Sequence, residues 1–304
     1  LGQVLTSGLG MNTARQVALG SGMQQTSFAY VVNQVCGSGM RATIDGSSKI
    51  YSGESNLLIV GGQESMSRAR HAYLSRTGEK KLGNNIFIDT LVNDGLTDAF
   101  SKEHMGITAE NVSRKYNVTR QDQDQFAYQS YLKTYKAIKN NYFKNELTKT
   151  SLKDEIRKDT TLPKLSQLKA VFKKSGTVTA GNASSLNDGA SFLALASEKY
   201  VTSNKIKPIA KVLSWASSAG NPDYMGVTPI TAIQKLMKKM SVNINYFNLV
   251  EVNEAFAATS VAVQRSLKID PSKLNIAGGA IALGHPIGCS GARIITTLSH
   301  QLRR

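Results

Sequence analysis

The hydrophobic and polar positions of the N-terminal region alternate between helix-type and strand-type patterns. A helix is expected to begin near residues 13–16, and a β-branched run at 31–35 leads into a second helix that continues to about residue 51. The continuous apolar run at 56–62 ends in two glycines and predicts a buried strand. Strands and helices joined by short connections indicate an α/β fold.

The same type of pattern returns in the C-terminal part of the chain. Period-two alternation at 191–197 and 209–215 is the pattern of half-buried strands. The elements expected after these are helices at 228–240, 254–267 and 290–304, with strands at 247–252 and 274–277.

Residues 65–185 differ from both flanking regions because charged and amide side chains are more frequent and apolar runs are shorter. Helices are expected at 107–116 and 120–140, the second preceded by Thr119 with an acidic residue three positions later, which is a helix start signal. This region is therefore interpreted as a long insertion of helices and loops. A short internal similarity supports two related halves around it: residues 32–36 and 252–256 each end a strand before a helix of small residues.

Composition limits the classes of function. The 304 residues are 41% hydrophobic, and no apolar run approaches the ~20 residues of a membrane-spanning helix. Two cysteines do not make a disulfide framework, so a cytoplasmic location is expected. The net charge of +16 fits an anionic small substrate, a nucleic acid or a solvated basic surface.

Cys36 lies where the β-branched run meets a helix, and Gly37 and Gly39 follow it closely. A helix N-terminus favours the thiolate, which is the nucleophilic form of cysteine. A buried structural cysteine fits the same pattern, and from this segment alone it is the better interpretation.

His285 lies in a second distinctive segment, residues 275–293, which contains five glycines. Glycines at this density indicate unusual backbone angles or close approach to a ligand, and a separate histidine completes a minimal cysteine–histidine pair. Asn253 could orient a water or a carbonyl, although its spacing favours an N-cap role. The sequence contains neither metal-ligand spacing nor a phosphate-loop motif.

Five ordered segments resemble the thiolase family over essentially the whole chain. They are the Cys36 segment, residues 61–67, 182–184, 253–257 and 284–288. Residues 88–106 are similar to the loop domain of the biosynthetic acetyl-CoA acetyltransferases in that family.

This resemblance implies a thiolase fold, in which two similar halves form a layered αβαβα arrangement with an inserted helical and loop domain. The N-terminal half would comprise residues 1–65 and 187–207, the loop domain 66–186 and the C-terminal half 208–304. The implied reaction converts two acetyl-CoA molecules to acetoacetyl-CoA and CoA through an acetyl-cysteine, with no separate cofactor and no metal.

The resemblance also implies roles for individual residues. Cys36 would carry the acetyl group, His285 would accept its proton, and Asn253 would hold a water that stabilises the thioester oxyanion with His285. The Cys36 backbone N–H would contribute to a second oxyanion site. Ser184 would meet the pantetheine amides and Arg157 the nucleotide end of CoA. The residues implied to line the channel are Leu96, His104, Met105, Phe172, Ala180, Leu186, Met225 and Phe256.

The sequence departs from the family pattern in one functional respect. Family members carry a second cysteine in a Cys-x-Gly-Gly-Gly turn, which moves the α-proton of the second substrate, and this turn is absent from the 304 residues. Cys289 is a poor substitute because relatives often carry other small residues there. We therefore expect that the 304 residues alone, if they are the whole protein, acylate Cys36 without completing the condensation. The alternative function is an acyl-CoA-binding protein with impaired catalysis.

Two rival classes are weaker. A ketoacyl synthase shares the fold, but it would place a second histidine where this chain has residues 253–256. Nucleic-acid binding rests on the charge alone. The segment 78–94 resembles a tetramerisation loop, so a homotetramer is expected in preference to a dimer.

Overall fold

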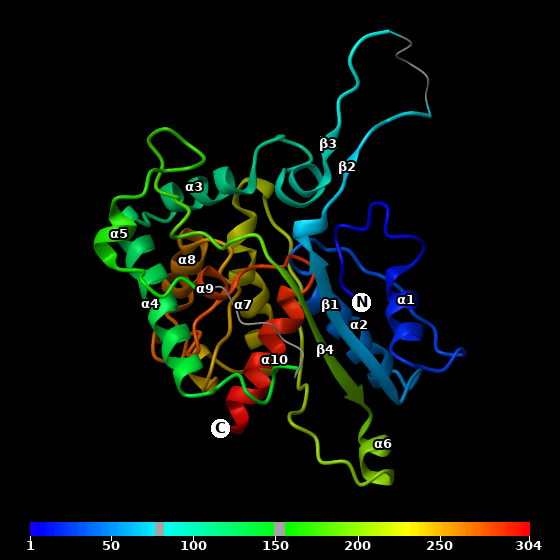
Figure 1. Cartoon of the computed structure of the whole chain (residues 1–304). Coiled ribbons are helices and arrows are strands. Elements are labelled where there is room, and N and C mark those ends of the chain that lie inside the picture. The colour runs from blue at the N-terminus through cyan, green and yellow to red at the C-terminus, as the bar shows by residue number, and fades with distance from the viewer. Residues whose placement is uncertain (77–81, 149–155) are drawn as a thin grey trace.

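The computed structural model describes residues 1–76, 82–148 and 156–304. The predicted helices are present in the predicted order (Figure 1). The helices are α1 (Thr13–Gly20), α2 (Ser38–Tyr51), α3 (Met105–Lys115), α4 (Arg120–Lys139), α5 (Leu162–Ser166), α6 (Glu198–Ser203), α7 (Thr228–Met240), α8 (Ala257–Leu267), α9 (Ala280–Leu283) and α10 (Ser290–Arg303). The strands are β1 (Leu57–Ser65), β2 (His71–Ala72), β3 (Ile88–Asp89) and β4 (Asp188–Ala196). Shorter turns are η1 (Met66–Arg68), the π-helical η2 (Leu91–Leu96), η3 (Pro222–Val227) and η4 (Ile244–Tyr246).

The N-terminal sheet is organised by β1 and β4, which pair antiparallel from Leu57↔Ala196 to Ser65↔Asp188. Gly2 forms parallel bridges to both Val32 and Gly62, so the chain's first residues lie between the segment before Cys36 and β1. The insertion leaves the end of β1 and returns at the start of β4. It therefore departs from and re-enters the sheet at neighbouring positions.

Helices α2 and α10 cover one face of this sheet (Figure 1). The two helices approach each other at small residues, since a Cβ on Gly39 would lie 2.7 Å from the Ala292 nitrogen. Helix α2 also lies close to β1, since a Cβ on Gly46 would lie 2.5 Å from Val60 Cγ1. On the opposite face Leu57, Ile59 and Phe192 are exposed. The close approach of α2 and α10 is what brings Cys36, just before α2, near the loop before α10.

The C-terminal half packs α7 and α8 around a short parallel bridge between Val250 and Leu274. Its core contains buried residues from α8 and from both bridge segments, with the inner face of α7 against them: Val252, Val263, Leu267, Ile269, Leu274, Ile230, Ile233 and Met237. The capping box predicted at the start of α4 is present, with the side chains of Thr119 and Asp122 each accepting the other residue's backbone N–H.

Three predicted strands differ from the structure. Residues 247–252 and 274–277 contribute only the single Val250–Leu274 bridge, and residues 209–215 join no sheet among the described residues. Ile209, Val212 and Leu213 are 49%, 47% and 64% exposed. Alternation reports only which side chains face a core, whereas a strand also needs a backbone partner.

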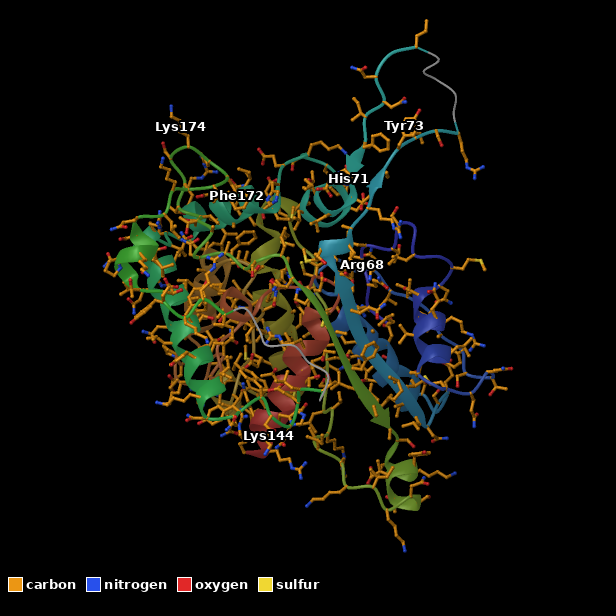
Figure 2. The ribbon with its side chains drawn as sticks, viewed as in Figure 1. Arg68, His71, Tyr73, Lys144, Phe172 and Lys174 are labelled. Atoms are coloured by element: carbon orange, nitrogen blue, oxygen red, sulfur yellow. The ribbon has the colours of Figure 1, made fainter. Side chains whose placement is uncertain are left out.

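An arm formed by β2, β3 and adjoining residues projects away from the rest of the chain (Figure 1). Tyr73 on this arm packs against Phe87, with ring centroids 5.6 Å apart, and Figure 2 shows His71 at the base of the arm and Tyr73 farther out along it. Of the segment 78–94 that resembles a tetramerisation loop, residues 78–81 lie outside the described residues.

Candidate active site

The chain turns sharply at Cys36 because the residue before it has a left-handed backbone. Val35 has φ +47°, an uncommon conformation for a β-branched residue. Ser38 stabilises the turn: its hydroxyl donates to the Val35 carbonyl at 2.6 Å and accepts from the Gln34 N–H at 2.8 Å. Strain of this kind is concentrated at functional sites, and here it presents a thiol directly before α2.

The loop that carries His285 is held against a different part of the chain. Gly284 has φ +93°, and a Cβ there would lie 2.1 Å from the Asn187 side-chain oxygen, so glycine is required. The His285 N–H donates to the Ser185 carbonyl at 3.3 Å. The side chain is 6% exposed, and its Nε2 atom lies 3.2 Å from Cys36 Sγ, although 249 residues separate the two in sequence.

Ser290 fixes the tautomer of His285. The Ser290 hydroxyl donates to the Pro286 carbonyl at 3.0 Å, and its oxygen lies 2.5 Å from His285 Nδ1. Since the hydroxyl proton is already used, we assign the proton between them to Nδ1, which donates to Ser290. The unprotonated Nε2 then faces the thiol of Cys36 and can accept its proton.

Asn253 lies beside the same imidazole. Its amide nitrogen is 3.4 Å from both ring nitrogens, so it is not directed at either one, and its buried Oδ1 has no partner in the described ranges. The N-cap interpretation is wrong, because α8 begins at Ala257 and Phe256 is its N-cap. A buried amide oxygen without a partner beside a histidine suits contact with a water or a substrate atom.

Burial dominates the electrostatics of the pair. It raises the pKa of the Cys36 thiol to about 11, and the charge of Glu64 raises it further, against a lowering by the backbone N–H of Cys36. Burial, reinforced by the positive charge of Arg293, lowers the pKa of His285 to about 4. The helix N-terminus was expected to favour the thiolate, but at these pKa values the substrate-free chain holds a neutral thiol beside a neutral imidazole.

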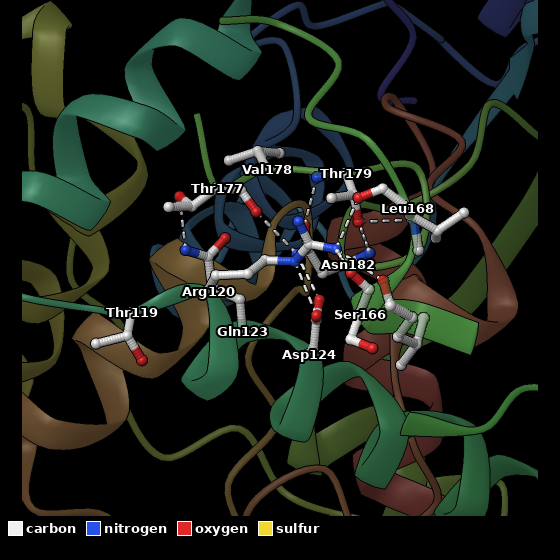
Figure 3. A network of polar contacts seen from close by, with 12 residues as sticks. Thr119, Arg120, Gln123, Asp124, Ser166, Leu168, Thr177, Val178, Thr179 and Asn182 are labelled. Atoms are coloured by element: carbon white, nitrogen blue, oxygen red, sulfur yellow. Dashed lines mark hydrogen bonds and ion pairs between the residues drawn. The ribbon is translucent and has the colours of Figure 1, made fainter. Parts of the chain in front are cut away.

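The Asn182–Ser184 segment is fixed by a polar network that begins on α4 (Figure 3). Arg120 Nε donates to Asp124 at 2.8 Å, and its Nη2 donates to the Leu165 and Leu168 carbonyls at 2.7 and 2.9 Å. Asp124 accepts from the Asn182 amide at 2.9 Å. Two residues later, the Ser184 N–H donates to the Ala255 carbonyl at 3.0 Å, so this segment runs beside the residues that follow Asn253.

Three of the expected channel residues form one aromatic group. Phe172 stacks on His104 with centroids 4.6 Å apart and meets Phe256 edge-on at 6.2 Å. Figure 2 shows Phe172 at α3, where a Cβ on Gly106 would collide with its ring at 2.2 Å. His104 also caps α3, because its Nδ1 accepts from the Gly106 N–H at 3.0 Å.

Arg157 and Ala180 line a small surface pocket of about 30 Å³ together with residues of α4 and α9. Arg157 Nη1 donates to the Ala180 carbonyl at 3.2 Å, which directs the guanidinium along this pocket. The remaining expected residues stand apart from these contacts. Leu96 and Met105 are partly buried, whereas Leu186 and Met225 are 57% and 36% exposed.

Cys289 has the properties of a structural cysteine. It is 2% exposed, and burial raises the pKa of its thiol to about 12. Its N–H donates to the Pro286 carbonyl at 2.9 Å, in the turn that leads into α10. A thiol that resists ionisation to this extent is unsuited to remove a proton from carbon at neutral pH.

Three functional side chains were missed by sequence reasoning: Ser290, Glu64 and Glu254. Ser290 follows His285 by five positions and could have been proposed as its partner. Glu64 and Glu254 are buried carboxylates, 3% and 1% exposed, and each is the second residue after the end of a predicted strand. Charged residues at that position in a buried segment are the signal that could have identified them.

No group of three or more His, Cys, Asp or Glu side chains in the ranges 1–76, 82–148 and 156–304 is placed to hold a metal ion. Within the same ranges, no helix combines the length and apolarity needed to cross a membrane.

Comparison with known proteins agrees with this geometry. An acetyl-CoA acetyltransferase of Rhizobium meliloti (strain 1021) is 46% identical over 315 aligned residues, which cover 100% of this chain and 80% of that protein. A second, from Shinella zoogloeoides, is 45% identical over 316 residues with the same coverage.

Two solved structures superpose closely. The acetyl-CoA acetyltransferase of Bacillus anthracis gives a TM-score of 0.96 at 37% identity, covering 100% of this chain and 80% of the other. The Acat5 thiolase of Ascaris suum, solved in complex with coenzyme A, gives 0.94 at 38% identity, covering 99% and 80%. Residues 1–199 match the thiolase N-terminal domain and residues 206–304 the thiolase C-terminal domain. This chain therefore belongs to the thiolase family.

Proposed function

We infer that this protein is an acetyl-CoA C-acetyltransferase, which interconverts two acetyl-CoA molecules with acetoacetyl-CoA and CoA. The observation that carries this inference is the contact of 3.2 Å between Cys36 Sγ and His285 Nε2, the ring nitrogen that the tautomer assigned above leaves unprotonated. A partly buried cysteine beside a buried histidine in a thiolase provides the nucleophile and the base that acyl transfer from a thioester requires.

In the acylation step, Cys36 Sγ attacks the carbonyl carbon of acetyl-CoA while its proton moves to His285 Nε2. Collapse of the tetrahedral intermediate breaks the bond between that carbon and the CoA sulfur, and the departing CoA thiolate takes the proton from His285. The backbone N–H of Cys36 supports the oxyanion. Neutral resting groups suit this step, since the thiol loses its proton only as the new bond forms.

The condensation step needs a base for the α-proton of a second acetyl-CoA. The family resemblance gives that role to a cysteine in a Cys-x-Gly-Gly-Gly turn, and Cys289 does not suit it because burial raises its pKa to about 12. Asn253 would hold, through Oδ1, a water that donates to the enolate oxygen of this second substrate, and His285 would contribute to the same oxyanion site when Nε2 carries a proton. The unpartnered Asn253 Oδ1 supports such a contact.

CoA would lie along the surface from Arg157 to the catalytic pair. Ser184 would contact the pantetheine amides, the group of His104, Phe172 and Phe256 would line the channel, and Arg157 would meet the nucleotide end. The net charge of +16 favours approach of a ligand as anionic as CoA.

Two assays test the proposal. Intact-mass measurement after mixing with acetyl-CoA detects acetylation of Cys36, and a second assay measures thiolysis of acetoacetyl-CoA by CoA. Cys36→Ser is the matched control and should show neither. Acetylation with thiolysis supports the acetyltransferase. Acetylation without thiolysis supports the alternative, a thiolase-like acyl-CoA-binding protein, and absence of acetylation rejects the proposed role of Cys36.

We also propose a homotetramer in which the arm around β2 and β3 forms contacts between subunits. Leu74, Leu82, Ile86 and Phe87 on the arm are 71%, 91%, 71% and 64% exposed, an apolar set that favours burial in an assembly. Light scattering of the wild type and of a Leu82→Asp variant tests this. We further propose that residues 1–65 and 187–207 form the N-terminal half, 66–186 the loop domain and 208–304 the C-terminal half, and that the protein is cytoplasmic.

A further inference from the structure

The loop that carries His285 is held at both ends by buried carboxylates. At one end the Ile281 N–H donates to Glu254 Oε2 at 3.2 Å, and at the other the Gly288 N–H donates to Glu64 Oε2 at 3.0 Å. His285 lies between these two attachment points. The carboxylates come from different halves of the chain, so the loop is fixed relative to both.

Glu64 joins three segments. Besides Gly288, its carboxylate accepts from the Val4 N–H at 3.0 Å and the Leu5 N–H at 3.1 Å. The joint is tight, because a Cβ on Gly62 would lie 2.0 Å from the Gly288 carbonyl oxygen. Leu5 belongs to a buried cluster against which Cys36 packs. Glu64 therefore ties the histidine loop to the segments that surround the nucleophile.

Glu254 performs the equivalent task on the other side. It accepts from Ser130 Oγ at 2.6 Å and from Asn275 Nδ2 at 2.8 Å, in addition to Ile281. A Cβ on Gly279 would lie 2.2 Å from its carboxyl carbon, so the start of the loop packs directly on it. Since Glu254 follows Asn253 in sequence, the same contacts fix the position of the Asn253 side chain relative to the imidazole.

We propose that Glu64 and Glu254 are positioning residues of the acyl-transfer reaction, which together set the distance and orientation of the His285 imidazole relative to Cys36. The proposal rests on the proposed function. Buried carboxylates are costly to desolvate and are poor sources of stability, so their presence at both ends of one catalytic loop points to a role in its geometry. Misplacement of a reacting group by about 1 Å can cost about 100-fold in rate.

The test uses Glu64→Gln and Glu254→Gln, with Glu198→Gln on exposed α6 as the matched control. In each buried variant the glutamine has nearly the shape of the glutamate, but its amide N–H₂ group faces an N–H or O–H donor that the carboxylate accepted from. We expect Cys36 acetylation at saturating acetyl-CoA to fall about tenfold or more, with half-saturation changed less than about twofold, because the contacts act on the reacting groups and not on CoA. Glu198→Gln should match the wild type.

The pH dependence of Cys36 alkylation by iodoacetamide distinguishes a role in positioning His285 from a general destabilisation of the fold. The charge of Glu64 raises the pKa of Cys36, so Glu64→Gln should lower the apparent pKa of alkylation while acetylation slows. Glu254 does not act on that thiol, so Glu254→Gln should leave the alkylation profile unchanged. Should Glu64→Gln not fold, Glu64→Asp keeps the charge but withdraws it by one methylene, and acetylation should fall with no shift of the profile.

The outcomes are distinct. The proposal is overturned if the folded Gln variants are acetylated at Cys36 at the wild-type rate. It is also overturned if the apparent pKa of alkylation shifts equally in both variants. If the wild type itself is not acetylated, the proposed function fails. The ¹⁵N shifts of the His285 ring then decide positioning without substrate: they should change in both Gln variants and stay unchanged in Glu198→Gln, and unchanged shifts in all three overturn it.

Discussion

Ser290→Ala removes the acceptor that holds the proton of His285 on Nδ1. The hydroxyl is 1% exposed and lies 2.5 Å from Nδ1, so the variant leaves a buried N–H without a partner unless the ring changes tautomer. If the proton moves to Nε2, it faces Cys36 and the ring can no longer accept the thiol proton. An unsatisfied buried donor costs about 1–3 kcal/mol, and the productive tautomer is disfavoured by the same amount.

This penalty corresponds to a loss of about 5- to 150-fold in the rate of Cys36 acetylation by acetyl-CoA. The assay is the intact-mass time course at saturating acetyl-CoA, with half-saturation measured in parallel and expected to stay constant. Ser299→Ala is the matched control, because Ser299 lies on the same helix and its hydroxyl donates to the Ile295 carbonyl at 2.8 Å, away from the pair. Acetylation of Ser290→Ala at the wild-type rate would refute the tautomer assignment.

Four further predictions concern stability, labelling and binding. His285 is buried in its neutral form with a pKa lowered to about 4, so between pH 6.5, its ordinary pKa, and pH 4 the unfolded state takes up a proton that the folded state does not. Urea titrations should show the free energy of unfolding falling by about 3 kcal/mol as the pH drops through this window, and by a smaller amount in the His285→Asn variant. Burial raises the pKa of Glu251 to about 7, so its ionised form destabilises the folded state at higher pH. Above pH 7 the Glu251→Gln variant should be more stable than the wild type by up to about 3 kcal/mol, and this difference should disappear as the pH falls to 4.5, the ordinary pKa. Iodoacetamide should label Cys36 and leave the 2% exposed Cys289 unmodified in folded protein, as peptide mass mapping would show. Arg157→Ala should raise half-saturation for acetyl-CoA about 2- to 10-fold with little change in the maximal acetylation rate.

Helices were the most predictable part of the fold. The ranges of α7 and α10 and the capping box at Thr119 follow from local signals, namely apolar periodicity, an early proline and a side chain that caps its own helix. Strands were less predictable because pairing partners are distant in sequence. The bridge of Val250 to Leu274 uses one residue from each expected strand, and nothing local distinguishes it from the full pairing of β1 with β4.

The site shows the same division between local and distant information. Cys36, His285 and Asn253 could be proposed from the segments they occupy, together with a family resemblance. Their mutual placement depends on contacts that no segment contains, such as the one between Glu64 and Gly288 across 224 positions. The backbone strain at Val35 could not be predicted either, because no local sequence pattern indicates that a valine adopts φ +47°.

The largest change concerns the charge state of the nucleophile. Position before a helix suggested a thiolate, and the backbone N–H of Cys36 does lower the thiol pKa, but burial and the nearby Glu64 charge raise it more, to about 11. A neutral thiol is a weak nucleophile, and it is also a poor target for oxidants that attack thiolates. The geometry then makes reactivity conditional: Nε2 takes the proton when a thioester carbonyl is present to receive the sulfur. A neutral pair with a buried imidazole of fixed tautomer thus restricts the reactive thiolate to the moment of acyl transfer, which a permanently ionised cysteine at the same helix would not do.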